Sequence, residues 1–199
     1  MNVTRESCLI TTIIPTYRRP KLLRRAILSV LSQTFKNVRV CIYDNASDDD
    51  TKLVVQHIAD QDKRVSYHCH SRNIVSYNKF YFGLERVDTT FFSLLSDDDC
   101  LAPEFYQTAL EGFEVYPSAY FVCLQTMVIN PNQSVLAAPL PVETVRFYSE
   151  GEGFKGMAQC TIPNTWTGIL FKKKVIDGIG IINTKAGMPA DAVSYTHLR

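Results

Sequence analysis

Residues 8–33 have the sequence "CLITTIIPTYRRPKLLRRAILSVLSQ", in which a strand pattern is followed at once by a helix pattern. The first seven residues are mostly apolar or β-branched, which is typical of a buried strand, and Pro15 ends the run. From Lys21 onward apolar residues recur every three or four positions, as in an amphipathic helix, and Pro20 suits the first position of a helix. The stretch therefore predicts a strand, a polar loop and a helix.

The same alternation continues through the first 116 residues. Further strands are predicted at 38–43, 64–70 and 90–95, and further helices at 50–61, 76–87 and 103–116. Strands that are separated by helices form a parallel sheet with right-handed crossovers. The expected fold class is therefore α/β, with a Rossmann-like, mostly parallel sheet flanked by helices. Ligands of such sheets bind beyond the carboxyl ends of the strands.

The pattern changes after residue 117. A long strand is predicted at 119–129, and another at 165–171 with a short helix directly after it. Residues 131–163 are rich in Pro and Gly and only weakly periodic, which indicates hairpins and an irregular lid. The last residues, 192–199, follow no periodic pattern, and we expect them to be a non-native tail on a chain that is cut short within its domain.

The bulk composition is that of an ordinary globular protein. Hydrophobic residues make up 46% of the 199 residues, charged residues make up 21%, and the net charge is +1. This balance gives no electrostatic reason to expect nucleic acid as a partner. No apolar run reaches the roughly 20 residues that a membrane helix needs. Six widely spaced cysteines without a C-x-x-C pair are typical of buried free thiols in a reducing compartment.

Three polar loops follow the first, second and fourth predicted strands. They are Pro15–Pro20 ("PTYRRP"), Asp44–Asp50 ("DNASDDD") and Asp97–Asp99 ("DDD"). Because the carboxyl ends of parallel strands meet at one edge of a sheet, we expect the three loops to form a single site.

Some of these residues also have structural explanations. Asp48, Asp49 and Asp50 precede a helix, where Ser47 or Asp48 could cap the first N–H groups and the helix dipole favours acids. Capping therefore explains those three acids better than catalysis does. Tyr17 is equally consistent with a packed surface aromatic and with a ring that stacks on a bound base.

Capping does not explain Asp97, Asp98 and Asp99, because the next helix starts only at Pro103. Adjacent carboxylates repel each other and need a cationic partner. A calcium loop of the EF-hand type is excluded, because it needs a glutamate at its twelfth position, where this chain has Thr108. Carboxylate oxygens suit Mg²⁺ or Mn²⁺, which bind through one or two carboxylates plus substrate phosphates. The cluster therefore predicts a divalent metal site.

The segments "TTIIPTYRRPKLLRRAILSVLSQTF", "VCIYDNASDDDT" and "FFSLLSDDDCLAPEFY" together resemble the family 2 glycosyltransferases, which have the GT-A fold. That family has a Pro-Thr-Tyr-Asn-Arg-like segment, an Asp-Asn-x-Ser-x-Asp-like loop and an Asp-x-Asp metal motif. The resemblance is good over residues 8–116 and continues more loosely to about 191. It implies a donor-binding half at 1–116 and an incomplete acceptor-side half at 117–191.

The resemblance also implies a role for each matching residue. The base pocket would be lined by Pro15, Thr16 and Tyr17, and Asp44 would accept a hydrogen bond from the base. Asp97 would lie near the ribose or the sugar with Asp98 beside it, and the metal at the diphosphate would be held by Asp99 together with Asp97. The remaining substrate-side candidates are Asn73 and Asn78.

Three positions depart from the family pattern. Arg18 stands where Asn is common, Val75 replaces a common glycine after Asn73, and Ser96 replaces an acid before the Asp-x-Asp motif. The change at Val75 leaves the local backbone path open, whereas the change at Ser96 leaves the motif intact.

The implied reaction moves a sugar from a UDP-, dTDP- or GDP-sugar to a hydroxyl of a glycan or lipid-linked acceptor, with inversion. Asp191 is the candidate catalytic base, although a surface aspartate explains it equally well. Trp166 would border the sugar or acceptor pocket, or else lie in the core. The resemblance implies a role in polysaccharide biosynthesis and a cytoplasmic location, and leaves peripheral association with the inner face of the plasma membrane open.

Two alternatives stay open at this point. The chain could be an inactive or truncated module that binds a nucleotide sugar without transferring it. It could also be a haloacid-dehalogenase-like phosphatase, in which Asp-x-Asp follows an apolar strand. That class usually carries the motif on its first strand, however, and it leaves the loops at Pro15–Pro20 and Asp44–Asp50 unexplained.

Overall fold

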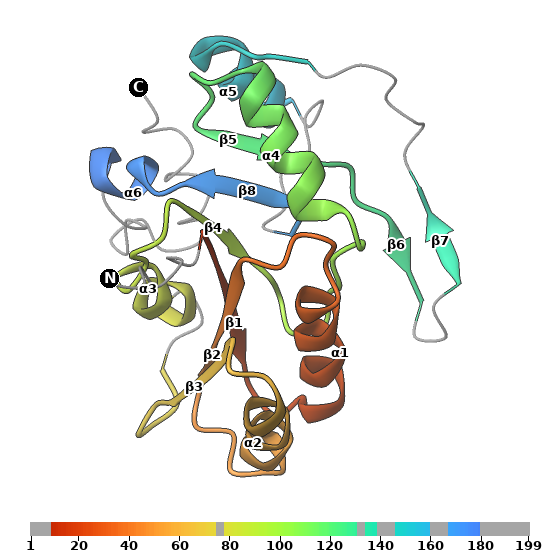
Figure 1. Ribbon diagram of the computed structural model, residues 1–199, viewed down its shortest axis with the longest axis vertical. Helices are drawn as coiled ribbons and strands as arrows, with labels where there is room; N and C mark the ends of the chain where they lie inside the picture. The colour runs from red at the N-terminus through yellow and green to blue at the C-terminus, as the bar shows by residue number, and fades with distance from the viewer. Residues whose placement is uncertain (1–8, 75–77, 131–133, 139–145, 160–166, 180–199) are drawn as a thin grey trace, which may run out of the picture.

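The computed structural model describes residues 9–74, 78–130, 134–138, 146–159 and 167–179. Its main sheet has six strands in the order β3-β2-β1-β4-β8-β5 (Figure 1). The strands are β1 Ile10–Thr16, β2 Val38–Asp44, β3 Val65–Cys69, β4 Phe91–Leu94, β5 Phe121–Cys123 and β8 Ile169–Lys172. The first four are mutually parallel, which confirms the predicted α/β class with a mostly parallel sheet.

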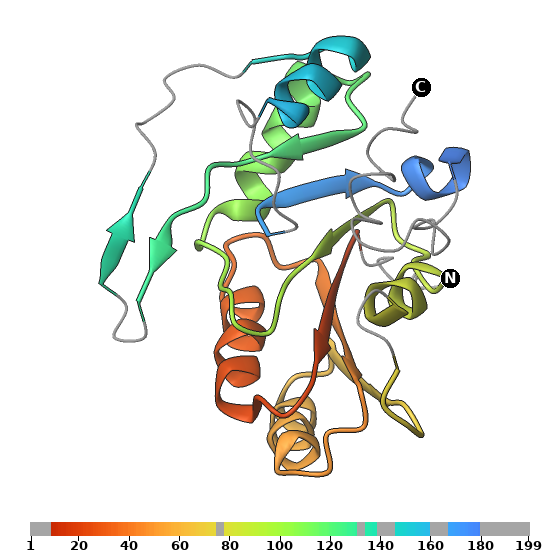
Figure 2. The same ribbon diagram turned by 180° about the vertical axis from the view of Figure 1, so that it is seen from behind.

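Helices cover both faces of this sheet (Figures 1 and 2). They are α1 Pro20–Leu31, α2 Thr51–Gln61, α3 Asn78–Leu84, α4 Phe105–Val115, α5 Glu150–Ala158 and α6 Lys174–Ile179. Neighbouring residues of β1 face opposite sides, as the pleat of a strand requires. Ile14 packs in one core cluster with residues of α1, α2 and α4, whereas Ile13 packs in the other with Leu84 of α3. All of β1 is therefore buried.

β1 continues through Pro15 to Thr16, which corrects the expectation that the strand ends at Pro15. The Ile13 carbonyl accepts a hydrogen bond from Leu95 on the β4 side, and the Thr16 carbonyl accepts one from Asn45 on the β2 side. By alternation the Pro15 nitrogen faces the β4 side, just where β4 ends. A proline is tolerated there because no ladder partner requires its missing N–H.

The second half of the chain departs from the sequence prediction in two ways. The predicted strand at 119–129 is wrong, because it divides into β5 and β6 (Val128–Ile129). β8 runs antiparallel between β4 and β5, and its pairing with β5 extends from Phe171 to Ile169. Among the described residues, no strand of that sheet pairs with the chain beyond Cys123. β6 pairs instead with β7 (Val135–Ala137), which confirms a hairpin in this region.

Helix α5 lies in a segment that the composition assigns to irregular structure. Its start has the S-x-x-E spacing of a capping box, and the Ser149 backbone N–H and hydroxyl both donate to the Glu152 carboxylate, at 3.0 and 2.6 Å. The S-x-x-E spacing indicates a helix start, whereas the glycines next to it favour irregular structure.

The structure also bears on the cysteines and on membrane spans. The four described cysteines are free, as predicted, but Cys41, Cys100 and Cys123 are only half-buried and Cys69 is exposed. Among the described residues, no helix is both long enough and apolar enough to cross a membrane.

Helix α3 packs so closely on the sheet that one position tests the fold. A Cβ at Gly83 would lie 2.6 Å from Cγ2 of Ile13 and 2.9 Å from Cε2 of Tyr43, so Gly83→Ala should lower the free energy of unfolding by about 1–3 kcal/mol. Gly178 in α6 has open space at the same point, so Gly178→Ala should leave stability unchanged or raise it by up to about 1 kcal/mol. Urea unfolding of both variants makes the comparison, and equal stabilities would contradict this packing.

Candidate active site

The three polar loops lie together at the carboxyl ends of β1, β2 and β4. Thr16 at the end of β1 pairs with Asp44 at the end of β2, and β4 ends on the other side of β1. Side chains join the loops directly. The Thr16 hydroxyl donates to Oδ2 of Asp97 at 2.8 Å, and the Arg18 backbone N–H donates to Oγ of Ser47 at 2.9 Å. The sheet thus brings together residues that are up to 81 positions apart.

Arg19 is the cationic partner of the first two acids. Its Nη1 lies 2.8 Å from Oδ2 of Asp98 and 3.3 Å from Oδ1 of Asp97. Asp97 is only 7% exposed, so its charge is balanced by this guanidinium and by the Thr16 hydroxyl rather than by solvent. The sequence prediction missed Arg19, although the need for a cation and the two arginines of "PTYRRP" were both apparent.

Asp99 points elsewhere. Its Oδ2 accepts a hydrogen bond from the Thr167 hydroxyl just before β8, and its backbone N–H donates to the Ser96 carbonyl at 3.2 Å in a tight turn. The three adjacent carboxylates therefore do not converge. Within the described ranges, no group of three or more His, Cys, Asp or Glu side chains is gathered closely enough to hold a metal.

The donor set of Asp97 and Asp99 nevertheless suits a hard divalent ion that arrives with a nucleotide. Mg²⁺ in such sites is held by one or two carboxylates, while phosphate oxygens and water supply the other ligands. Both residues offer carboxylate oxygens on one short turn after β4, and the Thr167 bond engages only one oxygen of Asp99. The chemistry of these residues is thus compatible with the predicted Mg²⁺ or Mn²⁺.

One face of α1 holds the acidic loop in place. Arg25, Ser29 and Gln33 recur at every fourth position, so they lie in one row along α1 and just past its end. Arg25 Nη2 donates to the Asp98 carbonyl at 2.8 Å, Ser29 Oγ accepts from the Leu101 N–H at 3.1 Å, and Gln33 Nε2 donates to the Ala102 carbonyl at 2.6 Å. We call these three residues the α1 row.

Asp44 is 2% exposed and is surrounded by protein donors. Oδ1 accepts from the Ser47 backbone N–H at 3.1 Å and from the Ser47 hydroxyl, and Oδ2 accepts from the Tyr67 hydroxyl on β3. Burial, and then the bond to Asp44, raise the pKa of the Tyr67 phenol. Tyr67 therefore stays protonated and acts as a hydrogen-bond donor at neutral pH.

The capping prediction for this loop needs a correction. Oδ1 of Asp49 accepts from the Thr51 N–H at 2.9 Å at the start of α2, whereas Ser47 serves Asp44 instead. Asp48, the other residue predicted to cap the helix, has a backbone φ of 39°, outside the helical range.

Asn73 lies at the same edge of the sheet, held by Asn45. Nδ2 of Asn45 donates to Oδ1 of Asn73 at 3.0 Å, and the backbone of Ile74 bonds the Asn45 side chain with both its N–H and its carbonyl, at 2.7 and 3.0 Å. Asn45 is 1% exposed and was not predicted, although it directly follows Asp44.

The structure describes three of the remaining candidate residues, Pro15, Tyr17 and Asn78. Pro15 is buried, and Tyr17 is half-buried with the Arg18 guanidinium 5.2 Å from its ring centre. Asn78 begins α3. Val75, Trp166 and Asp191 lie outside the described residues.

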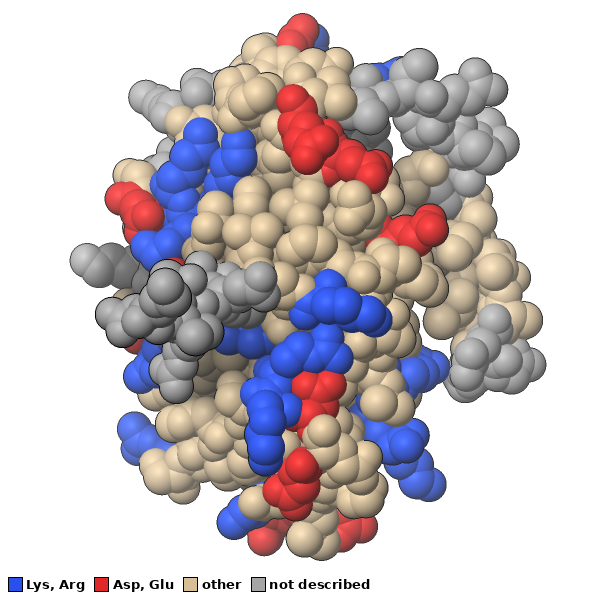
Figure 3. All heavy atoms as spheres, in the orientation of Figure 1, with Lys and Arg blue, Asp and Glu red and all other residues tan. Residues whose placement is uncertain are grey.

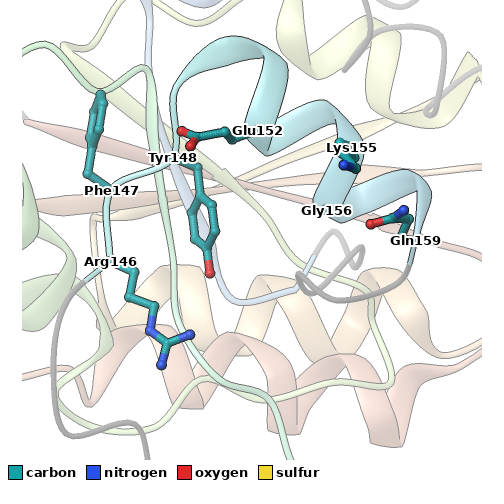
Figure 4. A pocket seen from close by; sticks show the side chains of 7 residues that line it. All are labelled: Arg146, Phe147, Tyr148, Glu152, Lys155, Gly156 and Gln159. Atoms are coloured by element: carbon teal, nitrogen blue, oxygen red, sulfur yellow. The ribbon is translucent and has the colours of Figure 1, made fainter.

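A separate pocket of about 520 Å³ lies along α5 (Figure 4). None of the predicted site residues lines it. Its lining residues are Arg146, Phe147, Tyr148, Glu152, Lys155, Gly156 and Gln159. Basic and acidic side chains are interspersed on the face shown in Figure 3, in keeping with the net charge of +1.

The sequence is similar to those of known glycosyltransferases. A β-1,3-glucosyltransferase of Campylobacter jejuni, named for the acceptor GalNAc(5)-diNAcBac-PP-undecaprenol, is 32% identical over 117 residues, which are 58% of this chain and 38% of that protein. An uncharacterized glycosyltransferase of Haemophilus influenzae is 31% identical over 94 residues, which are 47% of this chain and 38% of that protein. The chain thus spans well under half the length of these relatives.

Solved structures share the fold. Residues 1–349 of S. aureus TarS superimpose with a TM-score of 0.75 at 14% identity, covering 95% of this chain and 54% of TarS 1–349. The mannosyltransferase PcManGT of Pyrobaculum calidifontis gives 0.66 at 17% identity, covering 93% of this chain and 50% of that one. The family model described as "Glycosyl transferase family 2" matches residues 11–177, which include all three loops. The chain therefore belongs to glycosyl transferase family 2.

Proposed function

We propose that this glycosyltransferase takes its sugar from a nucleotide-diphosphate sugar and that the three loops bind this donor. The observation that carries the proposal is the joining of the loops at one edge of the sheet, where Thr16 bonds Asp97 and Arg18 bonds Ser47. Three structures of two proteins with the same fold support the ligand class by what they contain: TarS with UDP, TarS with UDP-GlcNAc, and PcManGT with GDP-Man and Mn²⁺. The family assignment leaves the phosphatase alternative without support.

The donor would lie across the loops in a fixed direction. Its base would lie beside Pro15, Thr16 and Tyr17 and near Asp44, with Asn73 and Asn78 as the remaining candidates on the substrate side. Its sugar and diphosphate would lie over the turn after β4, where Asp97 and Asp98 are paired with Arg19. A bound diphosphate would compete for the Arg19 guanidinium, since arginine forms charge-assisted hydrogen bonds to phosphate oxygens as well as to carboxylate oxygens.

Asp99 and Asp97 would hold Mg²⁺ or Mn²⁺ beside the diphosphate. Such an ion, when bound, neutralises the negative charge of the departing nucleoside diphosphate. The chain must supply the rest of the reaction. A carboxylate base would remove the proton of the acceptor hydroxyl while its oxygen bonds to the anomeric carbon and the bond from that carbon to the diphosphate breaks, which inverts the configuration. Asp191 is the candidate base from the sequence.

The acceptor is proposed as a glycan or a lipid-linked glycan. The supporting observation is the name of the C. jejuni relative, whose acceptor is a polyprenyl-diphosphate-linked saccharide. A cytoplasmic enzyme of polysaccharide biosynthesis, peripherally associated with the inner face of the plasma membrane, would meet such an acceptor.

Calorimetric titration with UDP, GDP and dTDP, each with and without Mn²⁺, tests the donor site. We expect one of the three nucleotides to bind strongly and only with Mn²⁺, because the acidic turn repels the diphosphate unless a cation is present. A chain that is folded by circular dichroism and binds none of them would contradict the proposal. Binding without turnover over a panel of glycan acceptors would favour the alternative of an inactive nucleotide-sugar-binding module.

The metal assignment is tested by Asp99→Ala. Loss of a ligand should weaken Mn²⁺-dependent nucleotide binding by about 100-fold or more, whereas the far-UV spectrum and the thermal midpoint should change little, since Asp99 lies on the turn and outside both core clusters. Asp60→Ala on the exposed surface of α2 is the matched control and should bind as the parent does. Retained metal-dependent binding in Asp99→Ala would defeat the assignment.

A further inference from the structure

The backbone of the two loops beside the proposed base pocket is held in an unfavourable conformation. Arg18, Ala46 and Asp48 have backbone φ values of 54°, 61° and 39°. Residues other than glycine rarely adopt such positive values. They are the described non-glycine residues with positive φ, and all three lie in the loops after β1 and β2. Backbone strain of this kind persists only where surrounding contacts enforce it.

A chain of hydrogen bonds supplies that enforcement. It starts at the Tyr67 hydroxyl, which donates to Oδ2 of Asp44, and passes to Ser47, whose N–H and hydroxyl donate to Oδ1 of Asp44. It ends at Arg18, whose N–H donates to Oγ of Ser47. Ser47 therefore donates with its hydrogen and accepts with its oxygen, which is the full use of a hydroxyl in a buried site. The chain links β3 through β2 to the loop after β1.

Tyr67 is the outermost member of this chain and lies on a different strand from the loops it fixes. It is half-buried, its ring packs against the core on the α1 side, and the next residue, His68, points to the opposite face. Its hydroxyl occupies Oδ2, the Asp44 oxygen that Ser47 does not use. Without that hydroxyl, the Asp44 carboxylate could rotate and release Ser47 and Arg18.

The same bonds limit what Asp44 can offer to a base. A carboxylate has about four acceptor positions, and three of those on Asp44 are filled by Tyr67 and the two Ser47 donors. The fourth position, on Oδ2, has only the Cys69 thiol at 3.9 Å, a weak donor that the N–H of a base can replace. This position suits a base with a single N–H donor, such as uracil or thymine. Guanine presents two adjacent donors and would need both oxygens.

We propose that Tyr67 is a positioning residue that fixes Asp44 and the two strained loops, and thereby selects a pyrimidine nucleotide with one N–H donor. This inference rests on the proposed donor site. It assigns to β3 a part in base selection that the loop motifs of the sequence do not indicate.

Tyr67→Phe removes only the hydroxyl, and Tyr120→Phe is the matched control, because that tyrosine lies 36% exposed beside Lys174 on a distant surface. Calorimetry with Mn²⁺ would compare UDP, GDP and inorganic pyrophosphate. We expect the parent to favour UDP over GDP. Tyr67→Phe should weaken the binding of UDP about 10-fold and bring the affinities for UDP and GDP closer together. The affinity for pyrophosphate should not change, since one hydrogen bond to a charged group is lost on the base side alone. Tyr120→Phe should match the parent.

If Tyr67→Phe weakened the binding of UDP and of pyrophosphate equally, Tyr67 would have a general structural role and the proposal would be overturned. An unchanged ratio of the UDP and GDP affinities would also overturn it. If the parent binds pyrophosphate but no nucleotide, the base site is wrong; if it binds neither, the donor site itself fails. Amide hydrogen exchange in the unliganded chain tests the hydrogen-bond chain separately. Exchange at Arg18 and Ser47 should be faster in Tyr67→Phe, and unchanged protection would contradict the link.

Discussion

The arrangement of the site depends on β1 being hydrogen-bonded along both of its edges. β2 on one side and β4 on the other are both parallel to it, so three chain segments end at the same edge of the sheet. The register matters as much as the direction. Because side chains alternate between faces, a slip of one residue in β1 would turn Thr16 away from Asp97, and a slip of one residue in β2 would turn Asp44 away from Tyr67. The complete burial of β1 between two core clusters is what fixes that register.

Polar contacts at this edge of the sheet then stabilise the negatively charged aspartates of the loops. Three adjacent acids are kept apart by their different partners: Asp97 and Asp98 turn to Arg19, and Asp99 turns to Thr167. On the neighbouring loop, Asp44 is engaged with donors of its own. Asp44 and the acidic turn thus each have their own set of donors, while the bond from Thr16 to Asp97 joins the base side of the site to the acidic side.

Local periodicity was sufficient to predict the type and order of the strands and helices from β1 to α4, because each of them carries its own pattern and Pro20 marks a helix start. Periodicity failed at 119–129, where pairing with β8 decides how long β5 is. It also failed at α5, where hydrogen bonds from Ser149 to Glu152 start a helix despite the nearby glycines. The loop motifs indicated Asp44, Asp97 and Asp99. They did not indicate Arg19, Asn45 or Tyr67, whose contacts span 78, 28 and 23 positions and exist only once the sheet has formed.

The α1 row binds the acidic loop through backbone atoms: the carbonyls of Asp98 and Ala102 and the N–H of Leu101. Every residue other than proline offers both groups, so these bonds do not depend on which side chains the loop carries. The path of the loop and its chemistry are therefore encoded in different places, one in α1 and the other in the loop itself. Evolution or design could exchange the side chains at 98–102 for a new ligand, and the helix would still hold the backbone in position.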